Sequence, residues 1–153
     1  MSTDKIGVIG AGKIGAAIAR GIIRAGLASK ENVMASDVGD ALRESIVQDL
    51  GVKATPDNTE LCHFADIVIL AVKPQIVDPV AHEIAKRLGK TKLLVSVAAG
   101  VPLRRIETQL EPGARVVRVM NQQCGRFTPS RGAMFIDQQT TTLRNPSGVP
   151  WPS

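Results

Sequence analysis

A glycine-rich turn follows the first apolar run of the chain and has the spacing of a phosphate-binding turn. Residues 6–9 are apolar, and the next six are Gly10-Ala11-Gly12-Lys13-Ile14-Gly15, which fits the pattern G-x-G-x-x-G. In such a turn the first glycine permits a tight bend, the second lets the backbone approach a pyrophosphate, and the third lets a helix pack closely on a strand. The alternative is a plain tight turn, but the position between a strand and a helix favours a dinucleotide site.

An acidic residue stands where a ribose-binding carboxylate is expected. Asp37 lies 22 residues beyond the last glycine of the turn, close to the spacing of about 20 residues that is typical of dinucleotide sites. A carboxylate there can bind the ribose 2′-OH and repel a 2′-phosphate, which favours NADH over NADPH. Two alternatives stay open. Asp37 could cap a helix that starts near Asp40, and a 2′-phosphate could still be accommodated by Ser36, Lys30 or Arg43.

Two further turns follow strongly apolar runs. The run 66–72 leads into Ala71-Val72-Lys73-Pro74, and the run 93–97 leads into a chain of small residues, Val97-Ala98-Ala99-Gly100. Ligands of open α/β sheets bind beyond the carboxyl ends of the strands, so both turns should face the cofactor. Lys73 could contact a ribose or phosphate, or it could be a surface lysine. The small residues could leave room for a nicotinamide ring, or they could simply form a tight turn.

Strand-like and helix-like segments alternate along the first 120 residues. Apolar runs predict strands at 6–9, 32–36, 52–55, 66–72, 93–97 and 114–120. Helical spacing predicts helices at 14–25, 41–50, 60–64, 77–88 and 102–110. This alternation predicts an α/β fold of the Rossmann type, a doubly wound parallel sheet with strand order 3-2-1-4-5-6.

The pattern changes after Met120. Residues 121–153 carry several prolines and glycines and no persistent helical or alternating stripe, so they are expected to form an irregular, poorly ordered tail. A short strand is possible at 133–136. The expected domain division is therefore 1–120 and 121–153.

Composition and charge exclude several functional classes. The net charge is +5, but acidic and basic residues alternate, which disfavours nucleic acid as a partner and leaves attraction of an anionic cofactor as the milder interpretation. The two cysteines, Cys62 and Cys124, and the two histidines, His63 and His82, form no catalytic or metal-binding pattern. No apolar run approaches the ~18 residues of a membrane span, and the chain opens directly on a strand, so no signal peptide is expected. We expect a reducing compartment, the cytoplasm.

These motifs together resemble pyrroline-5-carboxylate reductase over about residues 5–120. The residues that carry the resemblance are Ile6-Gly7-Val8-Ile9-Gly10-Ala11-Gly12-Lys13-Ile14-Gly15, Met34-Ala35-Ser36, Thr55-Pro56-Asp57-Asn58, Leu70-Ala71-Val72-Lys73-Pro74-Gln75, Leu94-Val95-Ser96-Val97-Ala98-Ala99-Gly100-Val101 and Arg115-Val116-Val117-Arg118-Val119-Met120. The glycine motif is shared by many reductases. Its combination with the Lys73-Pro74 and Ala98-Ala99-Gly100 turns is far more specific, and it argues against another dehydrogenase of the 3-hydroxyacid group.

The resemblance implies an oxidoreductase that transfers hydride from NADPH or NADH to the C=N carbon of a cyclic imine, 1-pyrroline-5-carboxylate, and produces L-proline. It assigns no catalytic residue and no metal. It implies cofactor contacts from Ile9, Gly10, Ala11, Gly12, Lys13, Ile14, Asp37, Asn58, Ala71, Val72, Lys73, Pro74, Val97, Ala98 and Ala99.

The chain departs from the family pattern in two places. Asp37 stands where family members often carry a serine, and Met120 is followed by Asn121-Gln122-Gln123-Cys124 where the family continues Met-Pro-Asn-Thr-Pro. Nothing in the tail resembles the family's helical domain, which supplies substrate contacts and the interface of the homo-oligomer. We expect the tail to arise from altered splicing, a frameshift or a gene-model error, and the chain alone to be weakly active or inactive. The alternative is a non-catalytic dinucleotide-binding module or an inert fragment, with exposed apolar surface.

Overall fold

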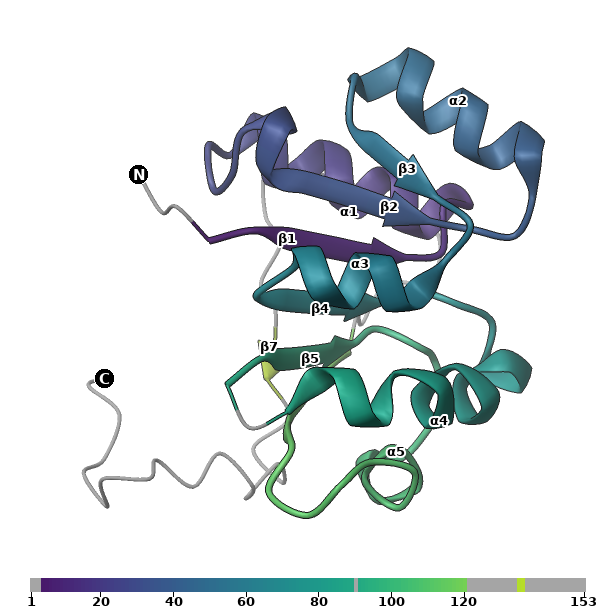
Figure 1. The fold of residues 1–153 in the computed structure, drawn as a ribbon, viewed down its shortest axis with the longest axis vertical. Coiled ribbons are helices and arrows are strands. Elements are labelled where there is room, and N and C mark those ends of the chain that lie inside the picture. The colour runs from purple at the N-terminus through teal and green to yellow at the C-terminus, as the bar shows by residue number, and fades with distance from the viewer. Residues whose placement is uncertain (1–3, 90, 121–134, 137–153) are drawn as a thin grey trace.

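The computed structural model of the chain describes residues 4–89, 91–120 and 135–136, and its centre is a single sheet (Figure 1). The strands occur in the order β3-β2-β1-β4-β5-β6-β7 across the sheet. All neighbouring pairs from β3 to β6 are parallel, whereas β7 runs antiparallel to β6. The strand bounds are β1 Ile6–Ile9, β2 Val33–Ser36, β3 Lys53–Thr55, β4 Ile67–Leu70, β5 Leu93–Ser96, β6 Arg115–Met120 and β7 Phe135–Ile136.

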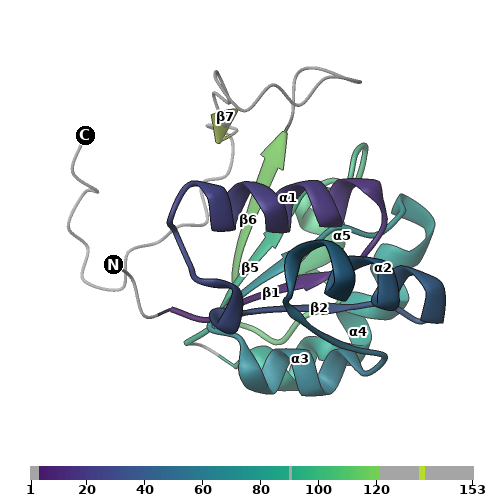
Figure 2. The ribbon, with the colours of Figure 1, turned by 90° about the horizontal axis from the view of Figure 1, so that it is seen from above.

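Helices connect the parallel strands and cover both faces of the sheet. The α-helices are α1 Lys13–Arg24, α2 Asp40–Leu50, α3 Asn58–Phe64, α4 Val77–Leu88 and α5 Leu103–Glu107, and two short 3-10 turns occupy Lys30–Asn32 and Pro74–Ile76. Figure 2 shows α1 on one face of the sheet and α3 and α4 on the other. This placement follows from right-handed crossovers that run first toward β3 and then, after α3, back across β1 toward β6.

The core consists of two apolar clusters, one on each face of the sheet. Side chains of α3, α4 and α5 form one cluster with Ile9 and Leu70, and side chains of α1 and α2 form the other with Val8 and Ile69. Adjacent residues of one strand therefore point into different clusters, so the central strands β1 and β4 are apolar at every position rather than at alternate ones.

The sequence-based prediction of the fold is confirmed, with strand order 3-2-1-4-5-6 and boundaries that shift by a few residues. The strand expected at 66–72 is shorter, Ile67–Leu70, and the helix expected at 102–110 is only Leu103–Glu107. The turn at Lys30–Asn32 was not predicted. The possible strand at 133–136 is present at Phe135–Ile136. The rest of the expected tail, and Cys124, lie outside the described residues.

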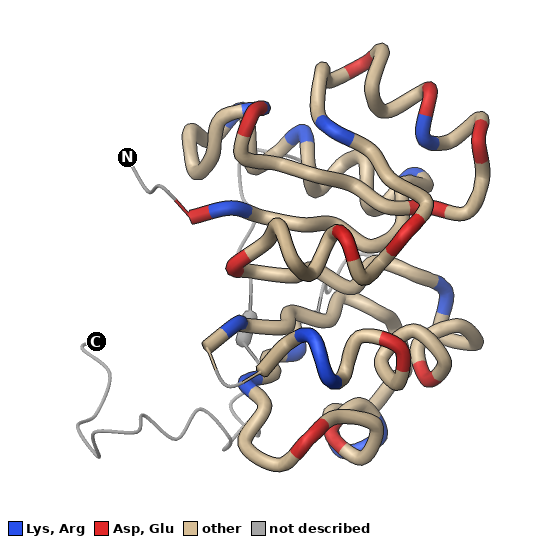
Figure 3. Tube along the Cα trace, viewed as in Figure 1, with Lys and Arg blue, Asp and Glu red and all other residues tan. Residues whose placement is uncertain are grey.

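Charged residues are interspersed along the described part of the chain rather than collected on one element (Figure 3). Among the helices that the structure describes, none has the length and apolar character that crossing a bilayer requires.

Candidate functional site

Gly10 forms the bend that joins β1 to α1 at the centre of the sheet. Its φ of +106° is a conformation that L side chains rarely adopt, and a Cβ added there would lie 2.5 Å from the carbonyl oxygen of Ala71. The Gly10 N–H donates to the Ser36 carbonyl at 2.8 Å, and the Ala71 N–H donates to the Ile9 carbonyl at 2.9 Å. The turn is therefore held between the ends of β2 and β4, at the point where the strand order reverses and ligands of this fold class bind.

The other two glycines of the turn have opposite surroundings. A Cβ on Gly15 would lie 1.7 Å from the Gly10 carbonyl oxygen, so any side chain there would push α1 away from the turn. A Cβ on Gly12 would meet no heavy atom within 4 Å. The free space over Gly12 fits a diphosphate, because a phosphate could approach the main chain there without displacing any described atom.

The N-terminus of α1 begins at this free space and lacks a side-chain cap. Its N-cap residue is Gly12, no side chain accepts a hydrogen bond from its first turn, and no acidic residue lies in that turn. The first N–H groups of a helix have no partner within the helix and carry the positive end of its dipole. An anion above Gly12 would therefore meet unpaired donors and a favourable field.

The carboxylate of Asp37 links the end of β2 to the glycine turn. Its Oδ2 accepts a hydrogen bond from the Ala11 N–H at 2.9 Å, and its Oδ1 accepts one from the Gly39 N–H at 2.9 Å. The N-cap of α2 is Gly39, without a side-chain cap bond. The helix-cap alternative for Asp37 is therefore wrong, because this side chain binds the turn and the N–H of the cap residue itself.

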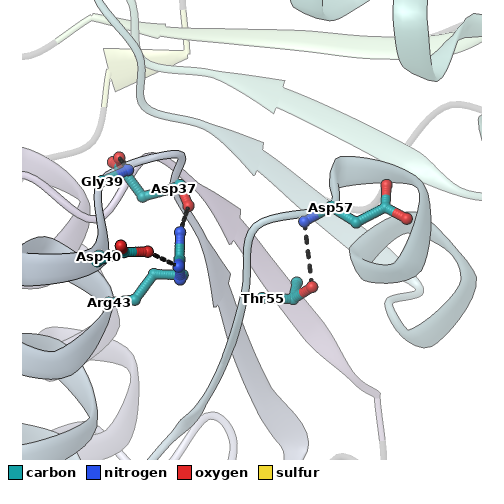
Figure 4. Close-up of polar contacts among 6 residues, drawn as sticks. All are labelled: Asp37, Gly39, Asp40, Arg43, Thr55 and Asp57. Carbon is teal, nitrogen blue, oxygen red and sulfur yellow. Dashed lines mark hydrogen bonds and ion pairs between the residues drawn. The ribbon is translucent and has the colours of Figure 1, made fainter.

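Arg43 of α2 lies beside Asp37 and is bound on two sides (Figure 4). Its Nη1 donates to the Asp37 carbonyl oxygen at 2.7 Å, and its Nη2 pairs with the carboxylate of Asp40 one turn earlier on the helix. The guanidinium therefore braces the start of α2 against the end of β2.

Asn58 and the buried hydroxyl of Ser36 form a second polar group at the same edge of the sheet. The Ser36 Oγ donates to the Asn58 Oδ1 at 2.6 Å, and the Asn58 Nδ2 donates to the Glu83 carboxylate at 3.2 Å. At the end of β3, the Thr55 Oγ1 accepts from the Asp57 N–H at 3.1 Å (Figure 4). These bonds fix the orientation of Asn58 from both β2 and α4.

The glycine turn, the bare helix N-terminus and the carboxylate at the end of β2 agree with a match to known families. The family model described as "NADP oxidoreductase coenzyme F420-dependent" matches residues 5–100 of the chain. The chain belongs to this family. The matched region runs from the start of β1 to the turn after β5, so it contains every residue of the site described above.

Relatives of this chain share a name. A pyrroline-5-carboxylate reductase of Methanosarcina acetivorans is 44% identical over 120 residues, which is 78% of this chain and 44% of that protein. Pyrroline-5-carboxylate reductase 3 of Macaca fascicularis is 36% identical over 149 residues, covering 94% of this chain and 54% of the relative. This second match extends past residue 120, further than the sequence analysis expected.

A solved structure supports the same relationship. Plasmodium falciparum pyrroline carboxylate reductase, solved with NADP bound, aligns with a TM-score of 0.69 and 30% sequence identity, covering 78% of this chain and 43% of that one. The chain thus spans about half the length of the relatives it matches.

In this chain the turns after β4 and β5 lie beside the glycine turn, and the sheet ladder extends into both. The Val97 N–H donates to the Leu70 carbonyl at 3.1 Å, next to the bond between Ala71 and Ile9. Ala98 is buried in the core, as is Ile9. Only the backbone of these two residues is therefore available to a ligand, whereas the side chains that the turns expose are those of Lys73, Pro74 and Ala99.

The described residues offer little acid–base chemistry at this site. Both His63 on α3 and His82 on α4 are exposed. Cys62 is buried, and burial raises the pKa of its thiol to about 11, so the side chain is a neutral core residue. Within the part of the chain that the structure describes, no group of three His, Cys, Asp or Glu could hold a metal ion.

Sequence reasoning missed two contributors to the site. Arg43 entered only as a possible phosphate ligand, although its spacing of three residues from Asp40 is a signal for an ion pair on one helix face. Glu83 gave no signal, because it reaches Asn58 from a helix 25 residues later in the chain.

Proposed function

We propose that this chain binds NADH or NADPH and forms the cofactor-binding half of a pyrroline-5-carboxylate reductase. The observation that carries the proposal is the free space over Gly12, where a close-packed glycine turn and the uncapped N-terminus of α1 present donors to an anion. We infer that residues 1–120 form this functional unit and that it works in the cytoplasm, which agrees with Cys62 being a free thiol.

The cofactor contacts proposed from the sequence gather at one edge of the sheet. The backbone from Gly10 to Ile14 would hold the pyrophosphate, and Asp37 would hold the adenosine ribose. Asn58 would border the same region from the end of β3. The turns at 71–74 and 97–99 would border the nicotinamide end of the cofactor.

The bound cofactor supplies the hydride that reduces the C=N carbon of 1-pyrroline-5-carboxylate to give L-proline. The chain itself would orient the cofactor, so the remaining task would be to hold the imine against the nicotinamide. We propose that the contacts to the imine, and the interface of the oligomer, belong to the part of the relatives that this chain does not span. The 153-residue chain alone should then bind cofactor but reduce the imine very slowly.

A substitution that fills the free space tests the cofactor site directly. Gly12 has a φ of −73°, which any residue adopts, so Gly12→Val should fold. Its side chain would occupy the space over the turn and should weaken NADH binding about tenfold or more, measured by calorimetric titration. The matched control is Ala25→Val at the exposed opposite end of the same helix, which should leave binding unchanged.

Two outcomes separate the candidate functions. Dinucleotide binding that Gly12→Val weakens about tenfold or more, together with slow imine reduction, supports the proposal. Binding with no detectable imine reduction, even after the missing half of a relative is supplied, would instead favour a non-catalytic dinucleotide-binding module, for which the partial coverage of the relatives is the supporting observation. If neither NADH nor NADPH binds, both candidate functions are refuted.

A further inference from the structure

We propose that Asp37 and the bonds around it make this site select NADH and reject NADPH. The inference rests on the proposed function only in requiring that a dinucleotide binds at the glycine turn. It concerns the 2′ position of the adenosine ribose, where the two cofactors differ by one phosphate group. It sets this chain apart from the Plasmodium relative, which was solved with NADP.

The Asp37 carboxylate is held in place but keeps acceptor capacity. Each of its oxygens accepts one backbone N–H, from Ala11 and from Gly39, both at 2.9 Å. A carboxylate has about four lone-pair sites, so acceptor sites remain for the hydroxyls of a ribose. The same negative charge repels a 2′-phosphate, which carries close to two negative charges at neutral pH.

Two of the three groups that could accommodate a 2′-phosphate are not available to it, because one is buried and hydrogen-bonded and the other lies far from Asp37. Ser36 is fully buried, and its hydroxyl donates to Asn58 at 2.6 Å. The Lys30 ammonium lies 3.9 Å from the position of a Cβ on Gly51, the residue that ends α2. Because α2 has 11 residues and each adds about 1.5 Å, this ammonium lies one helix length away from Asp37.

Arg43 is the remaining group, and its charge is already balanced. One of its nitrogens donates to the Asp37 carbonyl, and another pairs with the Asp40 carboxylate, as Figure 4 shows. The three charged groups, Asp37, Asp40 and Arg43, therefore sum to one negative charge beside the ribose position. A phosphate that reached one of the remaining guanidinium N–H donors of Arg43 would share the group with Asp40 and would still face the charge of Asp37.

The direct test compares ligands that differ only at the 2′ position. We expect the full chain to bind NADH at least about tenfold more tightly than NADPH, and 5′-AMP more tightly than adenosine 2′,5′-bisphosphate by a similar factor. Calorimetric titration of all four ligands measures both ratios. Equal affinities, or tighter binding of the phosphorylated ligands, would overturn the inference and leave the proposed function standing. Binding of none of the four would overturn both.

Two variants and a control locate the selectivity. Asp37→Asn removes the charge but keeps an oxygen that can accept from Ala11, so the affinity ratio of NADPH to NADH should rise about tenfold. Adding Asp40→Asn frees Arg43 and should raise the ratio further. Asp49→Asn, which removes a charge from the far end of α2 and leaves Arg20 without this partner, should leave the ratio unchanged.

Thermal melting checks that each variant is folded. If Asp37→Asn does not fold, the single Asp40→Asn variant and the wild-type comparison still decide the matter. An Asp49→Asn shift as large as that of Asp37→Asn would overturn the inference, because selectivity would then come from the overall charge rather than from the ribose position.

Discussion

At the scale of single residues, the glycine turn shows how one residue type serves different physical purposes within a stretch of six residues. Gly10 is required by its positive φ, Gly15 by its contact with the Gly10 carbonyl, and Gly12 by neither. Folding therefore constrains two of the three glycines, and the lack of such a constraint at Gly12 agrees with the proposed approach of a ligand to the turn.

Replacing Gly15 by alanine should destabilise the fold, whereas the same change at Gly12 should not. The added Cβ would lie 1.7 Å from the Gly10 carbonyl oxygen, and overpacking of this kind costs about 1–3 kcal/mol or more. The change at Gly12 meets open space, so its cost should stay below about 1 kcal/mol. Urea denaturation measures both. Similar free energies of unfolding for the two variants would contradict this account.

Cys62 should make the stability depend on pH in the alkaline range. Burial raises the pKa of its thiol from 9.0 to about 11 in the folded chain, so between these values the unfolded chain loses a proton that the folded chain keeps. The contribution of the thiol to the free energy of unfolding is therefore fully present below pH 9 and is lost as the pH rises toward 11. The free energy of unfolding, measured by chemical denaturation at several pH values in this range, should fall less steeply with pH for Cys62→Ala than for the wild type. An equally steep fall for both proteins would show that the thiol does not cause the pH dependence.

At the scale of elements, each helix presents one face to the sheet, and its ends are adapted to different purposes. Gly51 ends α2 with a φ of +69° and an N–H that donates to the Val47 carbonyl, which terminates the helix. The N-terminus of α1 has no side-chain cap, which is also true of α2, α4 and α5, whereas the Asp57 side chain caps α3. What sets α1 apart is the free space over its N-cap residue, because a Cβ on Gly12 would meet no heavy atom within 4 Å.

Helix α4 allows the contribution of the buried face to be measured. Ile84 is fully buried in the cluster that joins α4 to β4 and β5, whereas Ile76, just before the helix, is 45% exposed. Ile84→Ala should lower the free energy of unfolding by about 2–5 kcal/mol, and Ile76→Ala by less than about 1 kcal/mol. Chemical denaturation of both variants provides the comparison, and a small effect at Ile84 would mean that this packing does not support the sheet.

At the scale of the whole molecule, the two faces of the sheet are covered unequally in the described part of the chain. α3, α4 and α5 pack along one face, but α1 and α2 pack mainly near β1, β2 and β3 on the other. Val95 and Val97 on that second face are only partly buried. Apolar surface of this kind commonly marks an interaction site or promotes association.

The chain should therefore associate as its concentration rises. Sedimentation velocity over a series of concentrations should show weight-average mass increasing above that of the monomer, and Val95→Lys should reduce the increase by placing a charge on the partly covered face. Leu27→Lys, at an exposed position beyond α1, is the control and should leave the increase in weight-average mass unchanged. A monomer at every concentration would show that the rest of the chain already protects this surface.

The sequence by itself determined the elements and the order of the strands, because apolar runs, glycine spacing and helical stripes are local properties read over a few neighbouring residues, and it pointed to the glycine turn as the proposed site. Only the tertiary structure decided what surrounds that site. Asp37 meets the Ala11 N–H across 26 residues of chain, and Asn58 meets Glu83 across 25. Such partners are chosen by the packing of strands and helices, so coordinates were needed to exclude the helix-cap alternative for Asp37, and its contact with a ribose stays a prediction.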